Sequence, residues 1–171
     1  SSIFEKNIAC SGVIPQISAI YGPAAGGATY SPALTDFIFM VDQISQMYIT
    51  GPDVVKAVTG ENVTHQELGG VQTHAFKSGV SHFVHQDEET SINAIKELLA
   101  FLPQNNMETP PKDFSHSDVT DGFQDINKII PDDKSVGYDV LDVISNTWFR
   151  ISSKLAWIVM TGLLRNACRI Q

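Results

Sequence analysis

The chain of 171 residues is poor in cysteine, in positive charge and in long apolar runs. Two distant cysteines, Cys10 and Cys168, make no disulfide framework, which indicates a reducing compartment: the cytoplasm, or the mitochondrial matrix in a eukaryote. Eleven lysines and arginines against 19 acidic residues leave a net charge of −8, which argues against general binding to nucleic acid or to anionic membranes. The apolar run at 155–164 is shorter than the roughly 18 residues of a membrane span.

Several catalytic signatures are also missing. No lysine follows the glycine pair at 26–27 as in a phosphate-binding loop, and no GxSxG motif of a serine hydrolase is present. His74, His82 and His85 suggest a metal site at first sight. On one strand, however, His82 and His85 would point to opposite faces, and no carboxylate or cysteine joins them at ligand spacing. No metal site is therefore predicted.

Apolar segments alternate with helical patterns over the first hundred residues. Runs rich in β-branched and apolar side chains predict strands at 13–21, 37–41, 47–51 and 79–85. Capping signals and helical spacing predict helices at 25–34, at 53–60 after Pro52, from the Thr64–Glu67 capping box to Gly69–Gly70, and from Asp87 to Pro103. This alternation favours an α/β architecture.

The later part of the chain has a different composition. Residues 103–134 are polar and rich in proline, as in a surface connection, and 138–145 and 154–165 are helix-like. No internal sequence repeat is evident. Because the chain starts without methionine and stops within a helical pattern, we expect a fragment of a longer protein.

The stretch YGPAAGGATYSPALTD, residues 21–36, places Gly26 and Gly27 where a strand turns into a helix. Glycine costs a helix about 1 kcal/mol relative to alanine, so the pair needs a reason. The first N–H groups of a helix lack intrahelical partners and favour negative charge, which suits an oxyanion hole for a thioester enolate. Close packing of the helix against its sheet also explains the pair, and for an isolated glycine pair it is the more common reason. The motif alone leaves both interpretations open.

A second strand-to-helix turn lies in ITGPDVVK, residues 49–56. The helix that starts at Pro52 could face the same pocket as the glycine pair. More often, such a turn starts an ordinary surface helix that begins with proline.

Three segments together carry a family resemblance: residues 11–37, 49–70 and 73–84. They resemble carboxyltransferase subunits of biotin-dependent acyl-CoA carboxylases and decarboxylases, of the propionyl-CoA carboxylase β and methylmalonyl-CoA decarboxylase α type. The likeness runs from about Ile3 to Pro131. It implies an α/β, crotonase-like (ClpP/crotonase) spiral of ββα units. Residues 1–131 would be the C-terminal part of an incomplete N-terminal carboxyltransferase domain, and 132–171 a linker with the first helix of a truncated C-terminal domain.

The resemblance also implies a reaction. A carboxyl group would move between biotin and the α-carbon of a short acyl-CoA, propionyl-CoA or methylmalonyl-CoA, through a thioester enolate. The backbone N–H groups of Gly26 and Gly27 would form the oxyanion hole, and biotin would accept the proton without any metal. Residues expected to bind the acyl-CoA substrate are Pro23, Ala24, Ala25, Thr50, Gly51 and Pro52.

The implied partners are a biotin carrier domain or protein, biotin carboxylase or decarboxylase subunits, and further copies of the full-length chain. The resemblance leaves carboxylase and decarboxylase both open, although FLPQNNMETPP at 101–111 is similar to the decarboxylase branch. The alternative function is that of a truncated, non-catalytic chain that only binds CoA or docks onto intact subunits.

Overall fold

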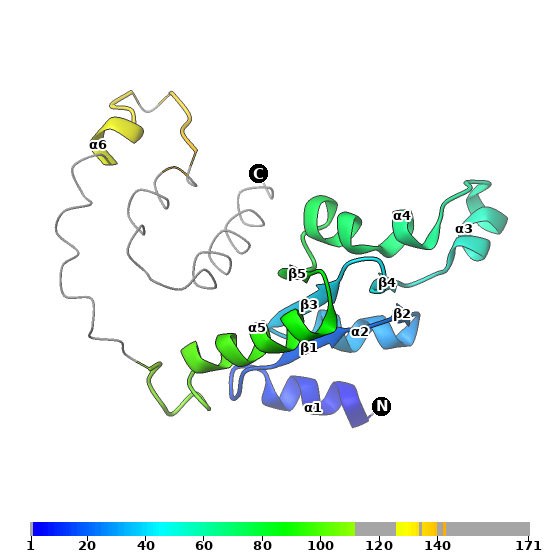
Figure 1. Ribbon diagram of the computed structural model, residues 1–171, viewed down its shortest axis with the longest axis horizontal. Coiled ribbons are helices and arrows are strands. Elements are labelled where there is room, and N and C mark those ends of the chain that lie inside the picture. The colour runs from blue at the N-terminus through cyan, green and yellow to red at the C-terminus, as the bar shows by residue number, and fades with distance from the viewer. Residues whose placement is uncertain (1, 112–125, 134, 140–141, 143–171) are drawn as a thin grey trace.

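The computed structural model describes residues 2–111, 126–133, 135–139 and 142, which form a mixed α/β structure (Figure 1). Its elements along the chain are α1 (Ser2–Cys10), β1 (Ile17–Ile20), β2 (Pro23–Ala25), α2 (Gly27–Ala33), β3 (Phe37–Val41), β4 (Gln46–Tyr48), α3 (Pro52–Thr59), α4 (His65–Gly69), the π-helix η1 (Thr73–Lys77), β5 (Phe83–His85), α5 (Glu88–Phe101) and α6 (Ile126–Ile129). The predicted fold class is confirmed.

Within the described residues, all strand pairs are parallel and lie in two sheets, β1-β3-β5 and β2-β4. In the first sheet Ile17 pairs with Phe37, and in the second Pro23 pairs with Gln46. The segments β1–β2–α2 and β3–β4–α3 are therefore two successive ββα units whose strands pair with their counterparts. A structural repeat is present although no repeat is visible in the sequence.

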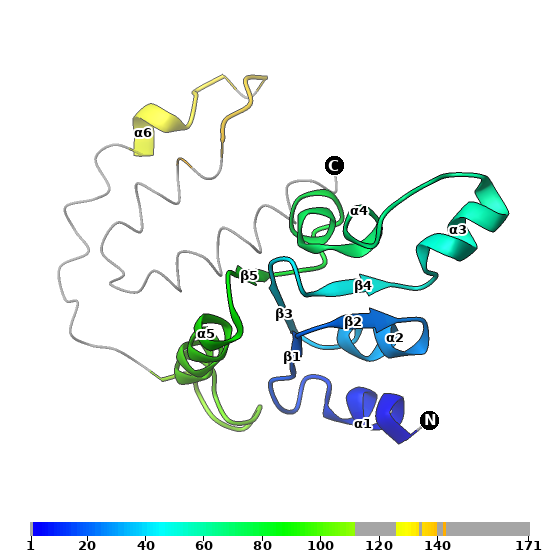
Figure 2. The same ribbon diagram turned by 45° about the vertical axis from the view of Figure 1, so that its right-hand side comes forward.

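Strand β3 separates two hydrophobic clusters, because successive side chains of a strand point to opposite faces. Ile38 and Met40 pack with Ile20, Met47 and Val71 on one side. On the other side, residues of β3, β5 and α5 form the second cluster: Phe39, Phe83, Ala94 and Leu98. Figure 2 shows α5 on one side of β3 and the β2–β4 pair on the other.

Local capping signals set the helix boundaries as predicted. Pro52 is the first residue of α3, and Gly60 caps its end after Thr59. Thr64 and Glu67 form the capping box of α4. The Asp87 carboxylate accepts a hydrogen bond from the Thr90 N–H at the start of α5.

Three predicted strands are shorter in the structure. The strand at 47–51 is β4, which ends at Tyr48, and β2 lies at a position where no strand was predicted. The strand at 13–21 begins only at Ile17, because its partner β3 starts opposite it at Phe37. The strand at 79–85 begins only at Phe83, because the N–H of Ile38 donates to the His82 imidazole instead of to a backbone carbonyl of β5. Helix α1 was not predicted, and none of its side chains is buried.

Several predictions fall outside the described residues. They are the helix at 154–165, most of the helix at 138–145, Cys168 and residues 112–125 of the connection. Within the part of the chain that is described, no helix is long and apolar enough to cross a membrane.

Candidate active site

Two strand-to-helix turns lie side by side at one edge of the small sheet. β2 and β4 are parallel neighbours whose last pair is Ala25 and Tyr48, so both chains leave the sheet at the same edge (Figure 2). Gly26 then caps α2, and Gly51 caps α3. The pairing of β2 with β4 thus brings the starts of α2 and α3 to the same end of the small sheet.

Gly26 adopts a backbone conformation that favours glycine, with φ of 59° and ψ of −126°. Its N–H donates to the Tyr48 carbonyl at 3.1 Å, which continues the β2–β4 pairing by one residue. A Cβ at this position would lie 3.7 Å from the Ile49 carbonyl oxygen. The glycine is therefore required by the turn, and its N–H is already engaged by β4.

Gly27 is the first residue of α2 and has a helical conformation without positive φ. A Cβ at Gly27 would meet nothing within 4 Å, so the space beside it is open. Among the described residues, no hydrogen-bond acceptor is found for the N–H groups of Gly27 and Ala28. The structure thus leaves Gly27 and Ala28, and not Gly26, with N–H groups available to a ligand. Ala28 was missed in the sequence, although its position as second residue of a helix signals an unpaired N–H.

Thr29 ties the first turn of α2 to both strands of the small sheet. Its side chain is buried, and its hydroxyl oxygen lies 3.0 Å from the Ala24 carbonyl and 2.9 Å from the Tyr48 carbonyl. Sequence reasoning did not single out this residue. A threonine inside a helix has many uses, and only the pairing of β2 with β4 brings the two carbonyls to it.

The residues predicted to bind substrate all belong to these two turns. Pro23, Ala25 and Thr50 are exposed, and Gly51 and Pro52 are half-buried. Ala24 points the other way and packs against the Ile38 and Met40 cluster. Its side chain is therefore directed to the core, and only its backbone can contribute to a site at the surface.

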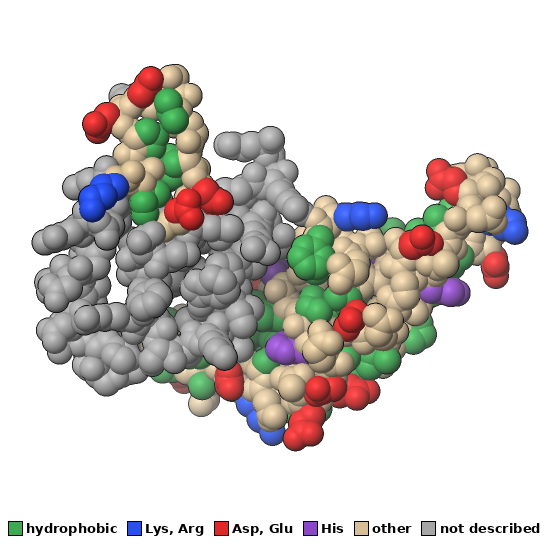
Figure 3. Space-filling model, turned by 45° about the horizontal axis from the view of Figure 1, so that its top comes forward, with side chains coloured by type: hydrophobic (Ala, Val, Ile, Leu, Met, Phe, Trp, Pro, Cys, Tyr) green, Lys and Arg blue, Asp and Glu red, His purple; other side chains and the backbone are tan. Residues whose placement is uncertain are grey.

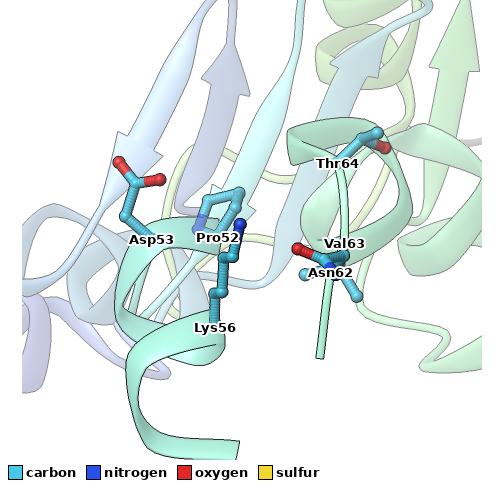
Figure 4. A pocket seen from close by; sticks show the side chains of 6 residues that line it. All are labelled: Pro52, Asp53, Lys56, Asn62, Val63 and Thr64. Carbon is cyan, nitrogen blue, oxygen red and sulfur yellow. The ribbon is translucent and has the colours of Figure 1, made fainter. Parts of the chain in front are cut away.

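An open pocket of about 260 Å³ lies beside the second turn, between α3 and the loop that leads to α4. Its lining residues are Pro52, Asp53, Lys56, Asn62, Val63 and Thr64. Figure 4 shows Lys56 beside Pro52 on α3 and Asn62 on the opposite wall. Of the residues predicted to bind substrate, Pro52 is the one that lines this pocket.

The histidines make structural contacts. The Nδ1 atom of His82 accepts a hydrogen bond from the Ile38 N–H at 3.0 Å, and His85 stacks on Phe39 with ring centroids 5.9 Å apart. Burial lowers the pKa of both imidazoles, and for His85 the negative charges of Asp87 and Glu97 partly oppose this effect. We predicted that His82 and His85 lie on one strand and point to opposite faces. This is wrong, because His82 precedes β5.

His74 is held in the same way, since its Nε2 atom contacts the Met47 carbonyl oxygen and its Nδ1 atom lies 2.9 Å from the Ser78 hydroxyl. Within the described ranges, no three side chains of His, Cys, Asp or Glu gather as metal ligands.

Proteins of known structure are similar to this chain in fold, and some of them also in sequence. The structure of transcarboxylase 12S with hydrolysed methylmalonyl-CoA bound is 49% identical, with a TM-score of 0.72, and covers 84% of this chain and 28% of that one. The β subunit of geranyl-CoA carboxylase from P. aeruginosa, at 24% identity and a TM-score of 0.53, shares the fold over 82% of this chain and 26% of its own. The fold is thus the crotonase-like fold of acyl-CoA carboxyltransferases.

Residues 1–153 match the model of the carboxyl transferase domain, and the chain belongs to this family. It is 53% identical over 143 residues to the methylmalonyl-CoA decarboxylase subunit alpha of Propionigenium modestum, covering 84% of this chain and 28% of the relative. It is 48% identical over 168 residues to the carboxyltransferase subunit of propionyl-CoA carboxylase from Haloferax mediterranei, covering 95% and 33%. The chain therefore spans about a third or less of the length of these relatives.

Proposed function

We propose that the full-length product of this gene moves a carboxyl group between biotin and the α-carbon of a short acyl-CoA. Propionyl-CoA and methylmalonyl-CoA are the proposed substrate pair. The observation that carries the proposal is the 49% identity, at a TM-score of 0.72, to a transcarboxylase whose structure holds hydrolysed methylmalonyl-CoA. The decarboxylase and carboxylase names of the relatives support the same substrate class.

The turn between β2 and α2 suits the charge that develops in this reaction. When a carboxyl group leaves or joins the α-carbon, negative charge spreads onto the thioester oxygen, and N–H donors aimed at that oxygen stabilise it. We assign this role to the N–H of Gly27, with that of Ala28 beside it. Gly26 shapes the turn through its positive φ and its hydrogen bond to Tyr48. Residues 23–28 carry no charged side chain, which fits a neutral thioester carbonyl better than a phosphate.

Carboxybiotin on a carrier would supply the carboxyl group while its ring nitrogen takes up the proton of the α-carbon. In the reverse direction biotin would accept the carboxyl group and return the proton. We assign no described residue to biotin, because the two turns offer backbone donors and small apolar side chains suited to the thioester. The proposed partners are therefore the biotin carrier, biotin carboxylase or decarboxylase subunits, and further copies of the full-length chain.

We propose residues 1–131 as the C-terminal part of an N-terminal carboxyltransferase domain. The scarcity of cysteine supports a cytoplasmic location, or the mitochondrial matrix in a eukaryote.

The proposal predicts biotin-dependent turnover. Purified full-length product, incubated with methylmalonyl-CoA and free biotin, is expected to form propionyl-CoA, which chromatography measures. The matched variant is Gly27→Val, whose branched side chain would stand in the open space beside the proposed donor. Its kcat is expected to fall by about 100- to 1000-fold, the usual effect of losing one oxyanion donor.

Two results would contradict the proposal. One is folded wild-type protein without biotin-dependent turnover. The other is a folded Gly27→Val variant with the turnover of the wild type, which would remove Gly27 from the site. A comparison of rates in the two directions then separates a carboxylase from a decarboxylase.

A further inference from the structure

Thr29 is the one residue of α2 whose side chain is buried, with 8% of its surface exposed. Its neighbours Gly27, Ala28 and Tyr30 are exposed. Burying a hydroxyl costs free energy unless it finds a hydrogen-bond partner. Here two partners are within reach, the carbonyl oxygens of Ala24 at 3.0 Å and of Tyr48 at 2.9 Å. A hydroxyl has one proton, so it donates to one of them at a time and can alternate between β2 and β4.

The Tyr48 carbonyl is a shared anchor for the start of α2. It accepts from the Gly26 N–H at 3.1 Å and lies 2.9 Å from the Thr29 hydroxyl, which matches the two lone pairs of a carbonyl oxygen. Gly26 and Thr29 flank the two residues with unengaged N–H groups, Gly27 and Ala28. The direction of those two N–H groups therefore depends on a segment held at both ends by one carbonyl of β4.

Helix α4 in turn contacts Tyr48 and strand β4. The Tyr48 hydroxyl lies 2.7 Å from Nδ1 of His65, the first residue of α4. At the other end of this helix, a Cβ on Gly69 would stand 2.3 Å from the Met47 carbonyl oxygen, so the backbones of α4 and β4 approach closely. Strand β4 therefore packs against α4 on one side, and on the other side its Tyr48 carbonyl binds the first turn of α2.

α2 needs such an anchor because it has little stability of its own. It has seven residues and contains Pro32, and isolated helices shorter than about 12 residues are marginal in water. A small rotation of its first turn would redirect the Gly27 N–H. A displacement of about 1 Å at a reacting group can cost 100-fold in rate.

We propose that Thr29 is a positioning residue for carboxyl transfer. Its hydroxyl holds the first turn of α2 against Tyr48, so that the Gly27 and Ala28 N–H groups point at the thioester oxygen as charge develops there. This inference rests on the proposed function, since it deepens the role of the same turn. A purely structural role for Thr29 would affect stability without a selective effect on kcat.

The test compares Thr29→Val, which keeps the shape and removes the hydroxyl, with Thr29→Ser, which restores the hydroxyl. The matched control is Thr35→Val, after the other end of α2, where the Thr35 hydroxyl donates to the Pro32 carbonyl at 2.7 Å. In the full-length product, the kcat of Thr29→Val is expected to fall by about 10- to 100-fold while KM for methylmalonyl-CoA changes less than about twofold. Thr29→Ser is expected to recover most of the loss, and Thr35→Val to keep the kcat of the wild type.

Hydrogen exchange gives a second readout in the same proteins. The peptide around 24–31 is expected to exchange faster in Thr29→Val than in Thr29→Ser. If Thr29→Val folds poorly, Thr29→Ala replaces it, because the smaller side chain lets water hydrogen-bond the Ala24 and Tyr48 carbonyls. The expected changes in kcat, KM and hydrogen exchange are the same.

The outcomes separate this inference from the proposed function. An active wild type whose Thr29→Val variant is equally active overturns the role of Thr29 alone. An equal loss of kcat in Thr29→Val and Thr35→Val also overturns it, since the effect would then not depend on the Tyr48 contact. A folded wild type without turnover overturns the proposed function, and the role of Thr29 with it.

Discussion

At the scale of single residues, Gly26 and Gly27 serve different purposes in the turn between β2 and α2. Gly26 has a positive φ and donates its N–H to Tyr48, so its role is conformational. Gly27 has an ordinary helical backbone, and the space beside it is open. The absence of a Cβ allows Gly26 to adopt its backbone angles, whereas at Gly27 it leaves the space beside the proposed N–H donor open.

This difference predicts opposite effects of alanine on stability. Gly26→Ala is expected to lower the free energy of unfolding by about 1–3 kcal/mol, because an L-residue is strained at φ of 59°. Gly27→Ala is expected to leave it unchanged or raise it by about 0.4–1 kcal/mol, since the helical conformation suits alanine. Denaturant unfolding of the full-length product measures both. Equal loss of stability in the two variants would contradict the assignment.

At the scale of elements, short capping signals set where the helices around the candidate site begin. Both turns of the candidate site end in helices capped by glycine, and α4, which supports β4, begins with the Thr64–Glu67 capping box. The Thr64 N–H donates to the Glu67 carboxylate at 2.8 Å, and the Glu67 N–H donates to the Thr64 hydroxyl at 3.1 Å. These bonds form within three residues of one another and do not depend on the rest of the fold.

The capping box predicts an acid-sensitive contribution to stability. Hydrogen bonds from the Thr64 backbone and side chain lower the pKa of Glu67 below its ordinary value of 4.5. Since the folded state favours the carboxylate, its contribution is fully present above pH 4.5 and is lost as the pH falls through the lowered pKa. Glu67→Gln is therefore expected to lower the melting temperature at neutral pH, and the difference from wild type is expected to shrink below pH 4.5.

The matched control for this measurement is Glu61→Gln, a glutamate outside the capping box. Its melting curve is expected to follow that of the wild type through the same pH range. A wild-type minus Glu67→Gln difference that stays constant from neutral to acid pH would show that the carboxylate does not stabilise the start of α4.

At the scale of the whole molecule, the described part leaves much apolar surface in contact with solvent. Figure 3 shows hydrophobic side chains reaching one face of the structure. Ile3 and Ile8 of α1, and Val54 and Val58 of α3, are each at least half exposed, at 59%, 69%, 50% and 79%. Strands β1 and β2 each pair on one side only within the described sheets. Exposed apolar patches and open strand edges favour association with other protein.

The 171-residue chain expressed alone is therefore expected to be poorly soluble and to transfer no carboxyl group. The reaction needs acyl-CoA and carboxybiotin held together, and such positioning supplies about 7–11 kcal/mol of the barrier. We assign only the acyl-CoA side to this chain, which spans 28% of the transcarboxylase that it resembles. Monodisperse chain, methylmalonyl-CoA and biotin are incubated, and propionyl-CoA is measured against the full-length product. Turnover above that of a Gly27→Val chain would show that these residues suffice.

Much of the fold was predictable because its signals are local. The strand at 37–41 and the starts of α3, α4 and α5 follow from side chains within a few positions of one another. Helix α1 could not be predicted, because none of its residues is buried and its apolar pattern marks no core face. The extent of β5 was missed because a side chain, His82, takes the place of a backbone partner for Ile38.

By itself, the sequence determined the family, the α/β class and the location of the two glycine turns, since these depend on motifs and on short-range patterns. Only the tertiary structure decided which N–H groups of the first turn are available. Gly26 loses its N–H to Tyr48, and Thr29 reaches the same carbonyl across a separation of 19 residues. No local pattern encodes that pairing, because it exists only once β2 and β4 lie in register and bring the two turns to the same edge of the sheet.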